Sequence, residues 1–441
     1  MTSLTRRRFV QQVALAAAAT ALPLRASEKM AVNGARLRQH LEGLSVFGRP
    51  PGGTFADGVS RTAYSEADVA GRQYVLGLMR DAGLDPTLDP AGNIFALRPG
   101  SEAAAKPILF GSHIDSVKGG GNFDGDVGSL SAIEVVQTLN ENRVATRHPL
   151  QAVVWAAEES NYGSGLAGSR AGAGLLEEGE LDRIQDGVTK ADAIRKIGGA
   201  PERIQEARRA PGWFTSYLEL HIEQGGKLDK AGIPIGVVEG IVSFDDYEVT
   251  VRGFANHAGT TPMPERKDAL IAASQMVVAV RDIVTSEPGA QVGTVGQMQI
   301  TPGAPNVIPG VVRFTIDLRD LSSQKVARIA EKLRIRLTEL AHSTGTEVEF
   351  RQTAHVEGAQ ADPAIQQAIA AATGELGLRH ITLPSGAGHD AQNMARLGPM
   401  GMTLVPSVDG ISHSPREFTR WDDVANGANV LMHTILRLDR A

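Results

Sequence analysis

Residues 106–130 read KPILFGSHIDSVKGGGNFDGDVGSL, a short apolar run followed by a polar, glycine-rich loop and a second apolar pattern. The run predicts a buried strand that ends near His113, and the segment after the loop predicts a helix. His113, Asp115 and Asp124 lie in or beside this loop. In open α/β sheets, ligands bind where strands end in such loops. The stretch therefore favours an α/β fold, and its polar residues are either part of an ordinary strand-to-helix turn or half of a metal site.

The same alternation continues on both sides of this stretch. Residues 36–48 and 65–83 predict helices, and the segments NIFALRPG and HPLQAVVWAAEES predict strands. Strands alternating with helices favour an α/β fold with a mostly parallel sheet covered on both faces. Because parallel strands end at one edge, we expect Glu158 and Glu159, after the second strand, to lie near His113.

A second pattern begins near residue 240. Its elements run from DDYEVTVRGF to TEVEFRQTA in the order β-α-β-β-α-β, which is typical of a ferredoxin-like unit. We therefore expect an inserted α+β domain at residues 240–350. It would separate two parts of the catalytic domain, residues 36–239 and 351–441.

Composition excludes several classes of function. The 441 residues carry a net charge of −6 and 5% aromatic residues, which argues against nucleic acid as a partner. The chain contains no cysteine, so disulfides and thiolate nucleophiles are excluded. Any metal ion must then be bound by imidazole and carboxylate groups.

Residues 1–26 have the composition of an export signal. Arg6, Arg7 and Arg8 precede an apolar run that is too short to cross a bilayer. The arrangement resembles a twin-arginine signal and predicts a periplasmic protein without a membrane partner. The alternative is an ordinary basic N-terminus followed by an alanine-rich helix.

The opening stretch contains the types of residue that bind metal. His113 is a candidate ligand because Asp115, two residues further on, can bond its other ring nitrogen. Glycines in the loop allow Asp124 to return towards His113, although Asp124 could instead cap the helix. Of the adjacent acids Glu158 and Glu159, one can bind metal while the other remains free as a base.

Two further histidines follow apolar strands. His221 lies in LELHIEQGGKLD and His413 in DGISHSPREF, each in a loop rich in glycine or serine. With His113, Asp124 and one glutamate, these residues could bind two metal ions that share Asp124. Such a pair of ions acidifies a bridging water, whose proton the free glutamate accepts.

Six motifs in order resemble the hydantoinase/carbamoylase family of amidases, within the two-metal aminoacylase and peptidase superfamily. They are GSHIDSVKGGGNFDGDVG, LELHIEQG, ANHAGTTPMPERKDAL, PGAPNVIPG, LPSGAGHDAQ and VPSVDGISHSP. The resemblance extends from about residue 36 to the C-terminus. It implies a binuclear hydrolase of C–N bonds other than peptide bonds, acting on a small carboxylate such as an N-carbamoyl-L-amino acid or allantoate.

The resemblance also implies a role for each site residue. Glu158 is the general base. Two divalent ions per subunit are expected, zinc being preferred over manganese, nickel or cobalt. The metal ligands are His113, His221, Asp124 as the bridge, Glu159 and His413.

Substrate contacts follow from the same resemblance. His257 in the inserted domain reaches across a homodimer to stabilise the oxyanion. Asn306 and Arg319 grip the substrate carboxylate, and Gln224 is a polar contact. His389 is a further candidate for a substrate contact.

Several alternatives remain open from the sequence. Arg319 could pair with Asp317 or Asp320, and His389 could be structural. Ser160 stands where the family often has glycine, which leaves the substrate pocket undefined. An aminoacylase or dipeptidase is disfavoured by His221, where related peptidases have aspartate. A non-catalytic binding protein or a structural dimerisation protein would not need the complete set of polar residues.

Overall fold

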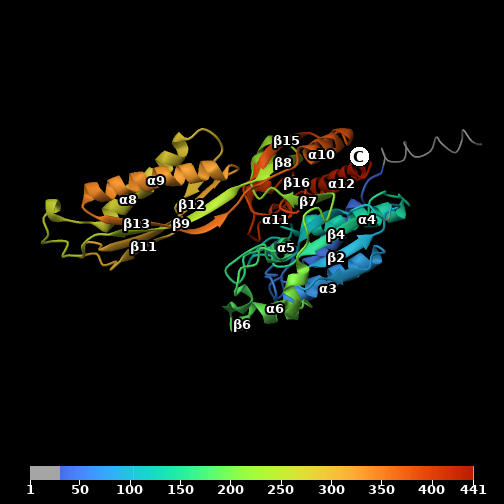
Figure 1. Ribbon diagram of the computed structural model, residues 1–441, viewed down its shortest axis with the longest axis horizontal. Coiled ribbons are helices and arrows are strands. Elements are labelled where there is room, and N and C mark those ends of the chain that lie inside the picture. The colour runs from blue at the N-terminus through green and yellow to red at the C-terminus, as the bar shows by residue number, and fades with distance from the viewer. Residues whose placement is uncertain (1–29, 103, 441) are drawn as a thin grey trace, which may run out of the picture.

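The computed structural model describes residues 30–102 and 104–440. In this part of the chain, nine strands form a large sheet and five form a smaller one. The two sheets lie towards opposite ends of an elongated molecule (Figure 1). The predicted export signal, residues 1–26, lies outside the described residues.

The large sheet is parallel at its centre. Its strands follow the order β1 (Pro86–Leu88), β2 (Ile94–Arg98), β4 (Leu150–Trp155), β3 (Ile108–His113), β7 (Ser216–Ile222), β16 (Met400–Val405), β8 (Ile235–Ile241) and β14 (Ala359–Gln360), and β15 (His380–Ser385) also pairs with β8. The pairs β4–β3, β3–β7 and β7–β16 are parallel, while antiparallel pairs occur on both flanks. The predicted mostly parallel α/β sheet is confirmed.

Helices cover both faces of the large sheet. One face packs against α2 (Gly34–Leu44), α3 (Glu66–Asp81), α4 (Asp126–Glu141), α10 (Pro363–Glu375) and α12 (Trp421–Leu438). The other packs against α5 (Ala167–Ala173), α7 (Lys227–Ala231) and α11 (Asp390–Met394). Successive strand residues such as Leu109 and Phe110 belong to the cores on opposite faces, because side chains alternate along a strand. Both faces are therefore apolar, and polar side chains collect at the strand ends.

A short hairpin and helix follow the loop after β4. They are β5 (Ile184–Gln185), β6 (Val188–Thr189) and α6 (Lys190–Lys196). Buried Glu180 accepts hydrogen bonds from Arg170 and Lys190 and ties this segment to α5. The segment between α5 and α6 thus has a charged cluster of its own.

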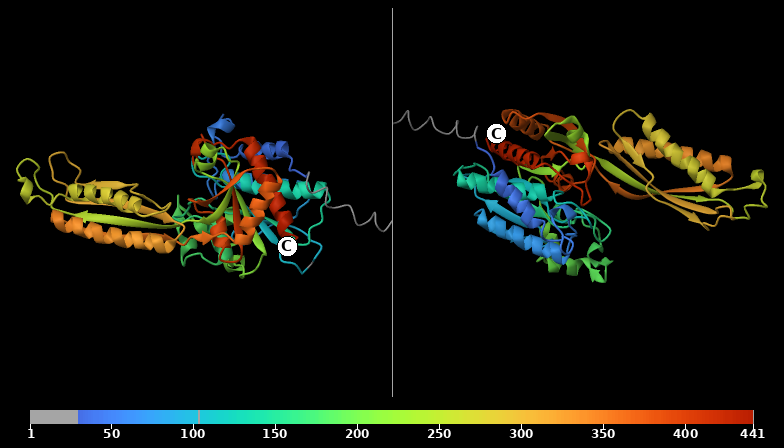
Figure 2. Two further views of the ribbon diagram at one scale, coloured as in Figure 1. Left: turned by 90° about the horizontal axis from the view of Figure 1, so that it is seen from above. Right: turned by 180° about the vertical axis from the view of Figure 1, so that it is seen from behind.

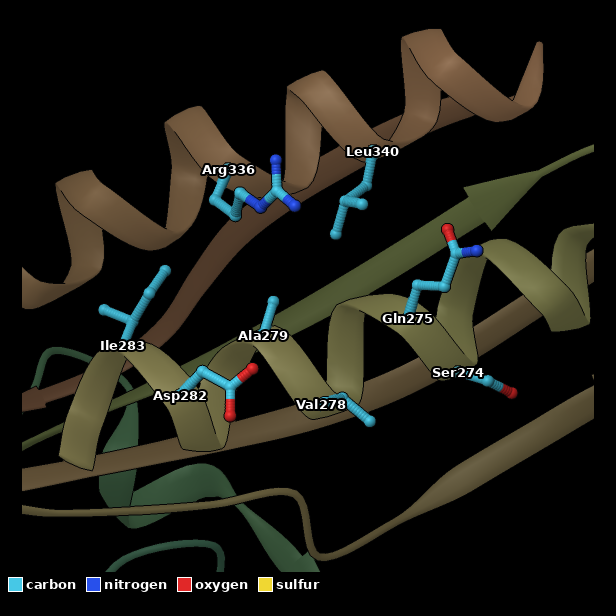
Figure 3. A pocket seen from close by; sticks show the side chains of 8 residues that line it. All are labelled: Ser274, Gln275, Val278, Ala279, Asp282, Ile283, Arg336 and Leu340. Carbon is cyan, nitrogen blue, oxygen red and sulfur yellow. The ribbon is translucent and has the colours of Figure 1, made fainter. Parts of the chain in front are cut away.

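The smaller sheet belongs to a separate unit with its own core. Its elements are β9 (Ser243–Arg252), α8 (Ala269–Ser286), β10 (Val292–Thr294), β11 (Met298–Thr301), β12 (Val311–Asp320), α9 (Ser323–Thr344) and β13 (Glu347–Val356). The antiparallel order is β10-β12-β9-β13, with β11 also on β12. This is the predicted element order, except that the segment predicted as the second strand of this unit is divided into β10 and β11. A shallow groove of about 620 Å³ runs between α8 and α9 (Figure 3).

Two long neighbouring strands connect the units. β9 and β13 pair from Arg252 and Glu347 to Phe244 and Val356. The predicted boundary at residue 350 therefore falls inside β13, since that strand continues for as long as β9 offers it a partner. Figure 2 shows the smaller unit extending away from the large sheet along these strands.

Candidate metal centre

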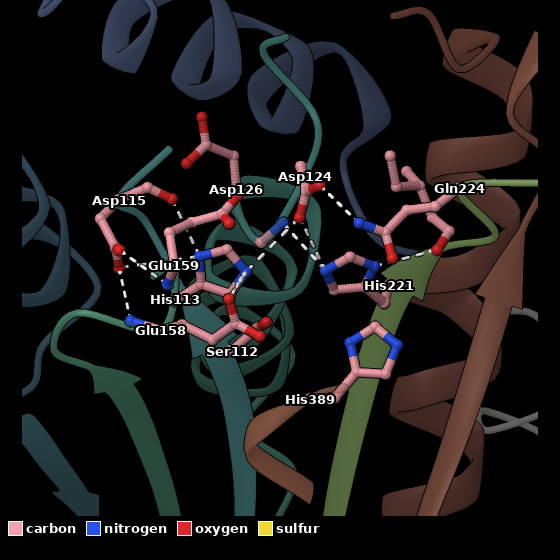
Figure 4. A network of polar contacts seen from close by, with 12 residues as sticks. Ser112, His113, Asp115, Asp124, Asp126, Glu158, Glu159, His221, Gln224 and His389 are labelled. Carbon is pink, nitrogen blue, oxygen red and sulfur yellow. Dashed lines mark hydrogen bonds and ion pairs between the residues drawn. The ribbon is translucent and has the colours of Figure 1, made fainter. Parts of the chain in front are cut away.

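All five predicted ligands lie together at the carboxyl ends of the parallel strands. Figure 4 labels four of them, His113, Asp124, Glu159 and His221. The ligating atoms form two groups, each with all atoms within 4.8 Å of one another. The groups are His113, Asp124 and His221, and Asp124, Glu159 and His413. Asp124 belongs to both groups.

The two carboxylate oxygens of Asp124 face different partners. Oδ1 lies 3.1 Å from His221 Nε2 and 3.5 Å from His113 Nε2. Oδ2 lies 3.2 Å from His413 Nε2, which is 3.5 Å from Glu159 Oε1. One carboxylate placed in this way can share its two oxygens between two cations.

Hydrogen bonds orient two of the imidazoles for ligation. His113 Nδ1 lies 2.9 Å from the carbonyl oxygen of Asp115, and His221 Nδ1 lies 2.9 Å from that of Ile222. A carbonyl only accepts, so each Nδ1 carries a hydrogen and each Nε2 can direct a lone pair at the cluster. His113 Nε2 is buried without a hydrogen-bond partner. A cation at this point would satisfy it, so the residues fit a metal.

The charges of the cluster depend on one another. Burial lowers the pKa of His113, but Glu158, Asp124 and Asp115 outweigh it and raise that pKa well above its usual value. Burial likewise raises the pKa of Asp124, but His221 and the other imidazoles hold it well below its usual range. Imidazole and carboxylate thus favour each other's charged forms, so metal binding here would release protons.

Asp115 acts differently from the sequence-based expectation. Its carbonyl, rather than its carboxylate, binds His113; the carboxylate oxygen lies 3.7 Å from Nδ1. The carboxylate instead accepts hydrogen bonds from the backbone N–H groups of Glu158 at 3.1 Å and Glu159 at 3.0 Å. Asp115 therefore holds the two adjacent acids in place.

Glu158 and Glu159 lie beyond the end of β4. Ala157 has a left-handed backbone with φ of 53°, which turns the chain after Trp155. Glu158 Oε2 lies 3.7 Å from His113 Nε2, yet Glu158 belongs to neither ligand group. Burial raises the pKa of Glu158 well above its usual value. Glu159 thus lies among the candidate ligands, and Glu158 lies beside them.

Gly125 allows the loop to return beneath His113. It has φ of 65°, and a Cβ atom there would come within 2.4 Å of the His113 ring. Gly125 is also the N-cap residue of α4, and no side chain caps this helix. The alternative role of Asp124 as a helix cap is therefore excluded.

Gln224 and His389 both border the cluster. Gln224 Nε2 donates to Asp124 Oδ2 at 2.7 Å and lies 3.4 Å from His413 Nε2. The His389 ring lies 4.5 Å from that of His221, and its Nε2 is 2.8 Å from Ser385 Oγ. His389 Nδ1 is buried without a partner, so both residues retain polar atoms beside the centre.

Asn306 and Arg319 are not brought together. Arg319 ends β12 near the large sheet, where it donates to Asp317 at 2.9 Å and to the Gly386 carbonyl at 3.0 Å. The alternative pairing with Asp317 is thus present. Asn306 precedes β12 at the opposite end, so the ten residues of that strand separate them, about 30 Å at the usual strand rise. Within one chain they cannot grip the same carboxylate.

His257 lies at the same far tip as Asn306. It forms a bridge with Val307, and the carbonyl of Asn306 accepts from the N–H of Ala258 at 2.9 Å. His257 Nδ1 accepts from the N–H groups of Gly259 at 3.0 Å and Thr260 at 3.2 Å. Nε2 therefore carries the hydrogen of the neutral ring, and the side chain is exposed.

Glu219 is a buried acid near the centre that was not predicted as a site residue. Glu219 lies on β7 beneath His221 and accepts hydrogen bonds from Ser112, Tyr217 and the N–H of Ala391. It stands two residues before His221, so the two-residue period of a strand places it on the same face. That spacing was the signal that could have found it.

Comparisons with known proteins cover almost the whole chain. The model of peptidase family M20/M25/M40 matches residues 109–437. The chain is 39% identical to N-carbamoyl-L-amino acid amidohydrolase of Geobacillus stearothermophilus, over 92% of this chain and 99% of that one. It is 34% identical to ureidoglycolate hydrolase of Arabidopsis thaliana, over 93% and 88%. A crystal structure of a hydantoinase/carbamoylase family amidase from Burkholderia multivorans has a TM-score of 0.85 at 37% identity, over 93% and 99%.

Proposed function

The chain belongs to peptidase family M20/M25/M40, and we propose that it hydrolyses the carbamoyl C–N bond of N-carbamoyl-L-amino acids. The observation that carries this proposal is the placement of Asp124, whose two oxygens face separate groups of ligands. The 39% identity to an N-carbamoyl-L-amino acid amidohydrolase supports the substrate class. The products would be the amino acid, ammonia and carbon dioxide.

The metal ligands are His113, His221, Asp124, Glu159 and His413. Two divalent cations bound by them would activate a water molecule and polarise the carbamoyl carbonyl. Imidazole and carboxylate suit zinc, with manganese, nickel or cobalt as alternatives. Asp115 supports the centre by holding the backbone of Glu158 and Glu159.

Glu158 is the general base. It lies beside the cluster, 3.7 Å from His113 Nε2, without belonging to a ligand group. A carboxylate in this position accepts the proton of the attacking water and returns it to the leaving amine. Gln224 and His389 line the same space and offer polar contacts to the substrate.

His257 acts on the centre of a second copy of the chain. It lies beyond the far end of β9, a strand of ten residues that spans about 30 Å. From there it cannot reach the centre of its own subunit, but its Nε2–H is free to donate to an oxyanion. Asn306 lies at the same tip and would reach the second chain's centre together with His257. Arg319 instead lies beside Gly386 of its own chain. The substrate carboxylate is thus bound by Arg319 of one chain and Asn306 of the other.

The inserted domain supplies the dimer interface. In the described part of the chain, α8 is the one helix long and apolar enough to span a membrane. It packs on the smaller sheet, and 39% of its residues are buried. Ile271 and Val278 remain 55% and 58% exposed, and Val278 borders the groove in Figure 3. All of β11, an edge strand of the smaller sheet, is exposed. A domain with an exposed apolar helix face and an unpaired sheet edge suits a second copy of the same surface.

We expect Val278→Glu to convert the dimer into monomers, because it places a charge in the apolar interface. Sedimentation velocity measures the change, and metal content should stay at the wild-type level. Turnover should fall as far as in His257→Ala, since a monomer lacks the His257 and Asn306 that a second chain would supply to each centre. Ile335→Glu, at an exposed apolar residue of α9 (48%), is the control and should remain dimeric. A monomer with full activity would contradict the shared site, and a Val278→Glu protein that stays dimeric would contradict the interface.

A metal-reconstituted activity screen tests the reaction itself. Release of ammonia is measured with N-carbamoyl-L-amino acids of varied side chain, allantoate, ureidoglycolate and β-ureidopropionate. Release of the free amino acid is measured with the same carbamoyl substrates, N-acetyl amino acids and dipeptides, so that the classes can be compared. We expect the first group to be turned over fastest. Faster hydrolysis of acetylated amino acids or dipeptides would favour the aminoacylase or dipeptidase alternative.

Location in the periplasm is part of the proposal. It is supported by the twin-arginine pattern of Arg6, Arg7 and Arg8 in the sequence. That route carries folded proteins, which suits a centre loaded with metal before export.

A further inference from the structure

Glu417 joins two loops that carry metal ligands from distant parts of the chain. Its Oε1 accepts hydrogen bonds from the backbone N–H groups of Phe123 at 3.0 Å and Asp124 at 3.1 Å. Its Oε2 accepts from the hydroxyl of Ser412 at 2.8 Å. The side chain is buried, and the loops that it connects are 293 residues apart in sequence.

These contacts lie on the side of Asp124 that faces His413. The Ser412 hydroxyl is 3.2 Å from Asp124 Oδ2, the same oxygen that lies 3.2 Å from His413 Nε2. Ser412 directly precedes His413, whose backbone is left-handed with φ of 53°. Holding Ser412 in place therefore also holds the backbone from which the His413 imidazole projects.

The loop that contains Gly121 packs closely against the Glu417 carboxylate. A Cβ atom on Gly121 would overlap the Glu417 carboxyl, so glycine is required there. Phe123 and Phe418, the chain neighbours of Asp124 and Glu417, contact each other edge to face with centroids 5.6 Å apart. Polar and apolar contacts thus join the two loops at one point.

We propose that Glu417 is a positioning residue for the metal ion bound by Asp124, Glu159 and His413. It sets the spacing between Asp124 and His413 through backbone N–H groups and Ser412, and it does not itself bind the ion. The inference rests on the proposed function in requiring two metal ions. Groups that orient ligands in this way typically change metal affinity by about 10- to 100-fold when they are replaced.

A Co²⁺ titration of the metal-free full-length protein, followed by absorption, tests this without a substrate. Wild type should bind two ions in two steps, and His221→Ala and His413→Ala assign each step to its ligand group. Glu417→Asp is one methylene too short to reach both loops. It should weaken the step that depends on His413 by about 10- to 100-fold and weaken the other step less, since only the shared Asp124 connects Glu417 with that group. Glu417→Gln keeps the length and one accepting oxygen, so it should retain most of the affinity.

Glu180→Gln is the matched control. Glu180 is also buried but binds Arg170 and Lys190 outside the centre. This variant should lower the unfolding temperature and leave both Co²⁺ steps unchanged.

Four results would overturn the inference. The first is weaker Co²⁺ binding by Glu417→Gln than by Glu417→Asp, which would show that the charge of the side chain matters more than its length. The second and third are an equal loss of both Co²⁺ steps in Glu417→Asp and no change in either step. The fourth is binding of fewer than two Co²⁺ ions by wild type. Binding of two ions with the expected pattern, but without turnover of any carbamoyl substrate, would contradict the proposed function and support this inference.

Discussion

Glu158→Gln should lower kcat by about 10²- to 10⁴-fold, the usual contribution of a general acid–base group. The amide has the shape of the carboxylate but cannot accept the proton of the attacking water. Metal content should not change, because Glu158 belongs to neither group of ligands. Turnover of N-carbamoyl-L-amino acids and metal analysis of the same preparation measure both effects.

Glu159→Gln is the matched control, since it makes the same change one residue further along. Glu159 Oε1 lies 3.5 Å from His413 Nε2 among the ligands, so this variant should lose metal as well as activity. If Glu158→Gln turned over within a few-fold of wild type, or if it lost metal and Glu159→Gln did not, the two roles would be wrongly assigned.

Mixing two inactive variants should restore activity if His257 acts across the dimer. His257→Ala and Glu158→Gln each leave every centre of their own homodimers defective. A mixed dimer has one centre that combines the intact Glu158 of one chain with the intact His257 of the other. Random exchange of equal amounts should therefore recover about a quarter of wild-type activity, because half of the dimers are mixed and each has one intact centre.

The same experiment has an internal control in Asn306. Asn306 lies at the tip with His257, so Asn306→Ala should also be complemented by Glu158→Gln. It should not be complemented by His257→Ala, because in the mixed dimer each centre then receives a tip that carries one of the two defects. Arg319→Ala, on the side of the centre's own chain, should be complemented by His257→Ala. No recovery in any mixture after exchange would place His257 and the centre in one chain.

Much of the fold could be predicted because its signals are local. The apolar run before His113 and the helical pattern after Asp124 correctly predicted β3 and α4. The alternation of strands and helices correctly predicted the class of the large sheet, and the family suggested by six motifs is confirmed. Element ends were less accurate. β13 continues to Val356 because β9 pairs with it that far, and this depends on the partner strand.

The site was predictable in its chemistry and less so in its geometry. The residues expected to bind metal could be chosen because imidazole and carboxylate at the ends of parallel strands must meet at one edge. The role of Asp115 was misjudged because its spacing from His113 suits the carboxylate and the carbonyl equally. The part played by Glu417 depends on two loops that only meet in the folded chain.

The sequence by itself determined which residues can bind cations and which segments become strands and helices, since periodicity and ligand chemistry are properties of short stretches. Only the tertiary structure decided which of those residues can act together. Asn306 and Arg319 are thirteen positions apart in the sequence, but a straight strand separates them by its whole length. His257 is likewise carried away from its own centre by β9, because an extended chain gains distance with every residue.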